Sequence, residues 1–164
     1  MTKEKLKAKE GFTLIEMLCA TAVMILVSAL MAVGIRVAVK AYNAEVMHSE
    51  SQVLCSTIRT TINDELRYAG TVTVTGDKVS FFSQTYGDGV SYSTNEDGQI
   101  LLGENKILSS KSYPYNIRAY VDKLTYNADS RIFTVHIRVT ESDGSSVLAE
   151  SDFQVKQLNE PSEG

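Results

Sequence analysis

The fold is decided by Lys9-Glu10-Gly11-Phe12-Thr13-Leu14-Ile15-Glu16-Met17-Leu18 and by the apolar run that follows it. From Phe12 to Ile35 the only charged residue is Glu16. At about 1.5 Å per residue, a helix over this run is roughly 36 Å long, whereas the core of a bilayer is about 30 Å thick. The run is therefore predicted to be a membrane-spanning helix.

The small residue that resembles a cleavage site, Gly11, lies in front of the apolar run. A secretory signal instead has a shorter apolar region of about 7–15 residues with the cleavage site behind it. Cleavage after Gly11 would remove only a leader, residues 1–11, which carries four lysines and two glutamates. Basic residues before a membrane helix favour a cytoplasmic N-terminus, so the C-terminal part is predicted to lie outside.

An acidic residue inside a membrane helix costs about 2.5–3.5 kcal/mol on insertion scales, so such residues are usually functional or paired. One explanation for Glu16 is a carboxyl near the membrane edge that is protonated or reaches water. The other depends on cleavage after Gly11. The new ammonium of Phe12 would then lie one helical turn from Glu16, and the two could pair within one subunit or between neighbours.

The motif Gly11-Phe12-Thr13-Leu14-Ile15-Glu16 resembles the class III signal of type IV pilins and type II secretion pseudopilins. The resemblance implies that a prepilin peptidase cuts after Gly11 and methylates Phe12. It also implies that Glu16 pairs with the N-terminus of a neighbouring subunit during fibre assembly. The close resemblance covers roughly residues 7–35, and the remainder matches the family only in architecture.

The same resemblance implies the partners and the location of the chain. The partners are the prepilin peptidase, other pilin or pseudopilin subunits, assembly-platform membrane proteins and the lipid bilayer. The chain would be a single-pass protein of the cytoplasmic (inner) membrane and then part of a cell-surface or periplasmic filament. Because no C-terminal disulfide loop is present and the C-terminal region is multi-stranded, a minor subunit is favoured over the major one.

Behind the membrane segment the helix is expected to continue, amphipathic over residues 36–69 and ending at Gly70. Glycine is a natural stop because it accepts the left-handed conformation at a helix end. Pilins commonly carry a proline in the membrane half, and this chain has Gly34 instead. The expected apolar stripe follows helical spacing and comprises Met47, Leu54, Ile58, Ile62, Leu66 and Ala69.

After Gly70 the pattern changes to short alternating strands, which predicts an α+β, pilin-like fold. Residues 70–158 are expected to form an antiparallel β-sheet domain that packs on the helix stripe, and residues 159–164 a flexible tail. The clearest predicted strand has Phe133, Val135, Ile137 and Val139 on one face. Residues 87–89 are expected to form a turn and residues 106–116 a polar loop.

The sequence offers little chemistry. His48 and His136 have no metal-ligand spacing around them, and turn chemistry explains residues 95–98 and 143–144 better than calcium binding. Cys19 and Cys55 are too far apart on one helix for a disulfide, although a bond between subunits through Cys55 stays open. We expect no cofactor, no metal site and no catalytic residues.

These observations favour a structural filament subunit, and the alternative is a membrane-tethered extracytoplasmic binding domain with an uncleaved signal anchor. An exported enzyme lacks a supporting residue set. The net charge of −4 gives no broad attraction for phosphate backbones, so no nucleic acid is predicted as a partner. A competence-type subunit that binds DNA would need a local basic surface. Secretion, adhesion, motility and DNA uptake are not distinguished by the sequence.

Overall fold

The computed structural model describes residues 11–159. Its single long helix, α1, spans Leu14–Arg67 and contains 54 residues. The helix thus begins and ends two residues inside the expected range of 12–69. The chain divides into two compact units, one up to Ala44 and the other from Glu45 onward.

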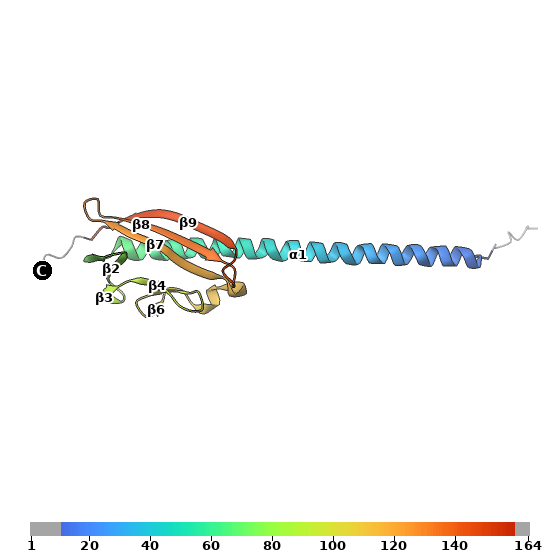
Figure 1. The fold of residues 1–164 in the computed structure, drawn as a ribbon, viewed down its shortest axis with the longest axis horizontal. Helices are drawn as coiled ribbons and strands as arrows, with labels where there is room; N and C mark the ends of the chain where they lie inside the picture. The colour runs from blue at the N-terminus through green and yellow to red at the C-terminus, as the bar shows by residue number, and fades with distance from the viewer. Residues whose placement is uncertain (1–10, 160–164) are drawn as a thin grey trace, which may run out of the picture. The chain divides into compact units, whose positions relative to one another are not determined.

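In the first unit α1 is exposed along its whole length, and up to Ile35 Glu16 is its only charged residue. Figure 1 shows this part of α1 in blue. The apolar stretch of α1 is long enough and hydrophobic enough to cross a membrane. The helix is continuous through Gly34, where nothing lies within 4 Å of an added Cβ.

The second unit combines the remainder of α1 with three antiparallel sheets of three strands each, where one sheet was expected. The first sheet contains β1 (Val72–Thr75), β2 (Lys78–Ser83) and β3 (Gly87–Val90). The second contains β4 (Tyr92–Thr94), β5 (Ile100–Leu102) and β6 (Asn105–Lys106). The third contains β7 (Arg118–Asn127), β8 (Ile132–Thr140) and β9 (Val147–Lys156). The α+β layout is confirmed.

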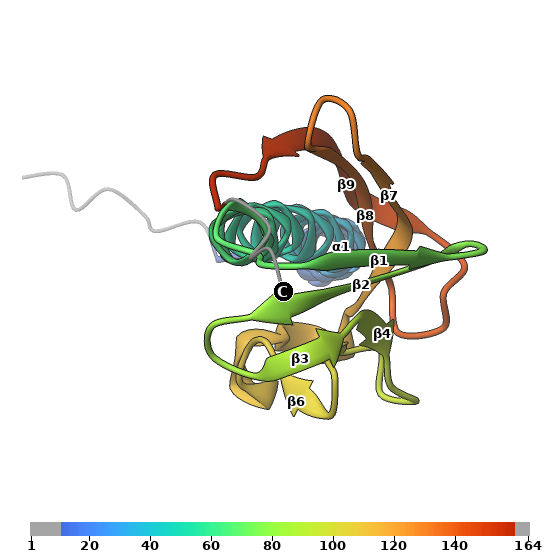
Figure 2. The ribbon, with the colours of Figure 1, turned by 90° about the vertical axis from the view of Figure 1, so that its left-hand side faces the viewer.

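The core of the second unit lies between α1 and the sheets. Figure 2 shows β8 and β9 on one side of α1 and β1 and β2 on another. The predicted stripe is confirmed from Leu54 to Ala69, where Ile58, Ile62 and Leu66 are each 0% exposed, whereas Met47 is only partly buried. The predicted inward face of β8 is also confirmed: Phe133, Val135, Ile137 and Val139 are all buried. Both patterns follow from the period of the element that carries them.

Gly70 is needed for a reason other than the expected one. Its φ is not positive, so it does not end α1 through a left-handed conformation. A Cβ at this position would instead lie 2.8 Å from Cδ1 of Phe82. The Gly70 amide donates to the carbonyl oxygen of Phe82 at 2.8 Å, which brings the two backbones close together.

One local expectation was wrong, and a second was incomplete. The glycines of residues 87–89, expected to form a turn, form β3 with Val90 and pair with β2. Gly87 and Gly89 take φ values of 89° and 67°, and a bulge in the pairing accommodates this. The expected polar loop of residues 106–116 contains two 3₁₀ helices, Ser110–Ser112 and Pro114–Asn116.

The carbonyl groups at the end of α1 are bonded by residues that follow β9. The Leu158 amide donates to Arg67 O at 2.8 Å, and Asn159 Nδ2 donates to Tyr68 O at 2.6 Å. Gln157 Nε2 donates to Ala69 O at 3.0 Å and to Gly70 O at 2.7 Å. Asn159, placed in the predicted flexible tail, is therefore tied down, and residues 160–164 lie outside the described range.

Candidate functional site

The start of α1 carries a reciprocal set of hydrogen bonds between Thr13 and Glu16. The backbone amide and the hydroxyl of Thr13 both donate to Glu16 Oε2 at 2.9 Å. In return the Glu16 amide donates to Thr13 Oγ1 at 3.3 Å. This is a capping box, in which the residue before the helix and the third residue of the helix satisfy each other's amides.

The capping box leaves half of the Glu16 carboxylate available. Both bonds from Thr13 end on Oε2, and no donor among residues 11–159 reaches Oε1. Glu16 is exposed, and the exposed side chains around it are apolar. The free oxygen can therefore accept a hydrogen bond from a cationic donor that another molecule or a new chain end supplies.

The predicted cleavage site precedes the capped helix. Gly11 and Phe12 are outside α1, and the Phe12 side chain is 79% exposed. No atom lies within 4 Å of an added Cβ at Gly11. Within residues 11–159 nothing covers the bond between the two residues. The rest of the predicted leader, residues 1–10, lies outside the described residues.

The sequence interpretation singled out Gly11, Phe12 and Glu16 but missed Thr13. The signal was present in the sequence, since Thr followed by Glu three residues later and an apolar run is the capping-box pattern. Thr13 fixes the first turn of α1 and holds the Glu16 carboxylate beside it. Gly11, Phe12 and Glu16 thus lie in one segment with Thr13, and Thr13 orients the Glu16 carboxylate.

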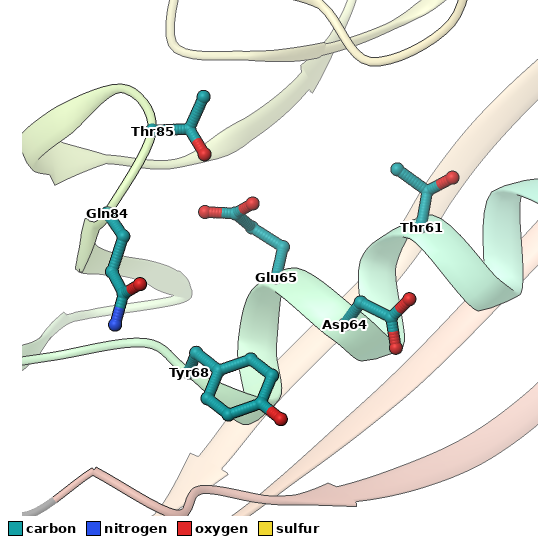
Figure 3. A pocket seen from close by; sticks show the side chains of 6 residues that line it. All are labelled: Thr61, Asp64, Glu65, Tyr68, Gln84 and Thr85. Carbon is teal, nitrogen blue, oxygen red and sulfur yellow. The ribbon is translucent and has the colours of Figure 1, made fainter.

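The second unit has a polar cleft at the C-terminal end of α1. Figure 3 shows its lining, in which Glu65 points between α1 and the loop of Gln84 and Thr85. Asp64 and Glu65 make no salt bridge within residues 11–159. Nearby, the Tyr92 hydroxyl is buried without a hydrogen-bond partner in the described residues. Its burial raises the pKa of Tyr92, and the negative charge of Glu65 raises it further.

The two histidines lie on the surface of the elements that carry them. His48 Nε2 and Gln52 Nε2 lie 3.1 Å apart on an exposed face of α1. On β8, His136 Nδ1 lies 2.7 Å from Asp152 Oδ1, and His136 Nε2 lies 3.7 Å from Asp122 Oδ2. Asp122 in turn accepts a hydrogen bond from Arg138 Nη2 at 3.0 Å. The imidazole of His136 thus lies between the carboxylates of Asp152 and Asp122. The three side chains do not point to a common site that a metal ion could occupy.

The two turns considered for calcium are closed by their own hydrogen bonds. Asn95 Oδ1 accepts a hydrogen bond from the backbone amide of Gln99 at 2.8 Å. Asp143 Oδ1 accepts from both the amide and the hydroxyl of Ser145, and these bonds lower the pKa of Asp143. Within residues 11–159 no group of three or more metal-ligating side chains comes together.

Neither cysteine is in a disulfide. Cys19 is exposed on the apolar part of α1, and Cys55 is buried in the second unit. Burial raises the pKa of the Cys55 thiol, which makes it less reactive. A bond between subunits through Cys55 would require that part of α1 to leave the core.

Comparison with protein-family models, with curated proteins and with solved structures finds no match for this chain. The functional argument therefore rests on the residues and their geometry. Two features stand out: a long exposed apolar helix with a capped carboxylate in its first turn, and a folded unit with polar surface cavities.

Proposed function

We propose that this chain is a prepilin-like structural subunit. It is cleaved after Gly11, N-methylated at Phe12 and assembled into a type IV pilus or a type II secretion pseudopilus, as a minor subunit. The observation that carries the proposal is the Glu16 carboxylate, which is capped on one oxygen and free on the other within an apolar helix.

The capped helix start supports the proposed cleavage. A protease needs its target bond in an extended, accessible segment, and the Gly11–Phe12 bond precedes the first turn of α1. Because Thr13 caps the helix, α1 does not need the residues before it to satisfy its first amides. Cutting the bond leaves the capping box intact and creates an ammonium at Phe12.

The exposed apolar surface of α1 supports the proposed move from membrane to filament. Lipid tails are about as apolar as aliphatic side chains, so exchanging lipid for neighbouring helices costs little hydrophobic free energy. Glu16 then provides specificity. A neighbour in the right register places its Phe12 ammonium against the free Glu16 oxygen, whereas a wrong register leaves a carboxylate unpaired in an apolar environment.

The orientation follows from the leader. Its excess of lysine keeps residues 1–11 in the cytoplasm, and the second unit lies on the outer side of the membrane. The acidic balance of residues 70–164 suits an exported domain that is not attracted to nucleic acid. The two unpaired cysteines agree with a minor subunit without a disulfide loop.

Intact mass and N-terminal sequencing of the protein recovered from its native membrane test the proposal. A chain that begins at Phe12 and carries one added methyl group is the expected result. A chain that still begins at Met1 would contradict processing as a prepilin.

The second candidate function is a membrane-tethered extracytoplasmic binding domain with an uncleaved anchor. Polar cavities on the second unit favour it, because a pure scaffold has no need of them. It predicts an N-terminus at Met1 and no loss of function on replacement of Glu16, so the same mass measurement separates the two candidates.

A further inference from the structure

A cavity of about 470 Å³ opens where three segments of the second unit meet. The turn between β4 and β5, the two 3₁₀ helices with the start of β7, and the turn between β8 and β9 each contribute to it. Its volume lies within the range of about 300–1,000 Å³ that is usual for small-molecule sites. The lining residues are Asp97, Gln99, Ser110, Tyr113, Asn116, Ile117, Arg118 and Ser142.

Gln99 contributes a side-chain amide to the lining of this cavity. The residue is only 8% exposed, and its Oε1 accepts from Asn95 Nδ2 at 3.4 Å. Its Nε2 donates to no atom of residues 11–159, yet Gln99 lines the cavity. The rest of the Gln99 side chain is held by its contact with Asn95, so this amide nitrogen has a fixed place at the cavity surface. Gln99 therefore provides a donor that a bound molecule can use.

Arg118 and Asp97 provide one charge of each sign without pairing with each other. Within the described residues no carboxylate lies within 4 Å of the Arg118 guanidinium, and no cation lies within that distance of Asp97. The Arg118 stem lies across Gly98, where an added Cβ would be 2.3 Å from Arg118 Cγ. Gly98 has a φ of 73° and leaves the room that the stem needs.

The backbone beside the cavity is strained. Tyr115 and Asn116 have φ values of 54° and 55°, which non-glycine residues rarely adopt. The Tyr115 ring is 63% exposed, so packing of that ring does not explain the strain. Strain of this kind concentrates at binding and catalytic sites. Here it places the Asn116 amide in the cavity lining.

We propose that this cavity binds a neutral saccharide. The formal charges of Asp97 and Arg118 cancel, so a neutral ligand fits better than an anion or a metal ion. Sugar hydroxyls donate and accept at once, and this matches acceptors on Asp97 and Asn116 and donors on Gln99 and Arg118. The inference stands whether or not the chain is assembled into a filament.

The test is saturation-transfer NMR and calorimetry on the full chain in micelles of lauryldimethylamine oxide, a detergent without a sugar headgroup. The probes are glucose, galactose, mannose, N-acetylglucosamine, lactose and chitobiose. At least one should bind saturably. Arg118→Met should weaken that binding by about tenfold or more, since one charge-assisted hydrogen bond is lost.

Asn116→Gly provides a variant that keeps the fold, because glycine adopts this backbone without strain. It should weaken binding while leaving thermal stability unchanged or higher. Lys156→Met, at an exposed position at the end of β9, is the matched control for charge removal and should bind as the unmodified chain does. Absence of binding by all six probes, equal binding by Arg118→Met and the control, or tighter binding of free glycine than of any sugar would each overturn the proposal.

Discussion

Replacing Gln157 with Leu should destabilise the second unit strongly. Gln157 is 2% exposed, and its amide forms three hydrogen bonds. Nε2 donates to Ala69 O and Gly70 O, and Oε1 accepts from the Tyr126 hydroxyl at 2.6 Å. Leucine has a similar volume and none of these groups, so the change removes the bonds without leaving a large cavity.

The expected loss is about 3 kcal/mol, from about 1 kcal/mol for each of the three bonds. The two carbonyls and the hydroxyl left without a partner could only add to this loss. A loss of this size is a large share of the roughly 5–15 kcal/mol that stabilises a typical domain.

Urea unfolding of the full chain in micelles measures the effect, followed by tyrosine fluorescence because the chain has eight tyrosines and no tryptophan. Gln154→Leu is the matched control, since Gln154 is exposed on β9, the strand that Gln157 follows. The control should change the free energy of unfolding by less than about 0.5 kcal/mol. Equal effects of the two variants would refute the role assigned to the Gln157 amide.

Three further predictions concern the helix and its ends. Glu16→Ala should insert and be cleaved but enter filaments at least about tenfold less, because the Phe12 ammonium of a neighbour would have no partner. Immunoblots that compare sheared filaments with membranes measure this incorporation, and a normal level would contradict the prediction. Gly11→Glu should leave the chain uncleaved, with an intact mass that includes residues 1–11, if a prepilin peptidase processes it. Gly70→Ala should cost about 1–3 kcal/mol in urea unfolding, because its Cβ would lie 2.8 Å from Phe82, whereas Gly34→Ala, in open space, should not destabilise the second unit.

Periodic patterns predicted the elements well. The spacing of Leu54, Ile58, Ile62 and Leu66 identified the buried stripe of α1, because only one face of that helix segment contacts the sheets. The alternation from Phe133 to Val139 identified the buried face of β8 for the same reason. Both signals are local, because each lies within a single helix or strand.

Features that depend on contacts between distant segments could not be predicted. Gly70 was expected to act through its backbone conformation, but it is constrained by Phe82, which reaches it through the β1–β2 hairpin. The saccharide cavity joins Gln99, Arg118 and Ser142, which no spacing rule relates. For the candidate assembly site, Gly11, Phe12 and Glu16 were read from a motif, and Thr13 was missed although its signal was local.

The hydrogen bonds at the C-terminal end of α1 also imply an order of folding steps. The chain is synthesised from its N-terminus, and Ala69 receives its bond from Gln157, 88 positions later. Until that late segment is made, the carbonyl groups that Gln157 and Leu158 bond have only water as a partner. The second unit therefore completes its folding after nearly all of it has emerged, and contacts so distant in sequence form slowly. A chain that ended before Gln157 would leave the carbonyl groups of Arg67, Ala69 and Gly70 without these partners.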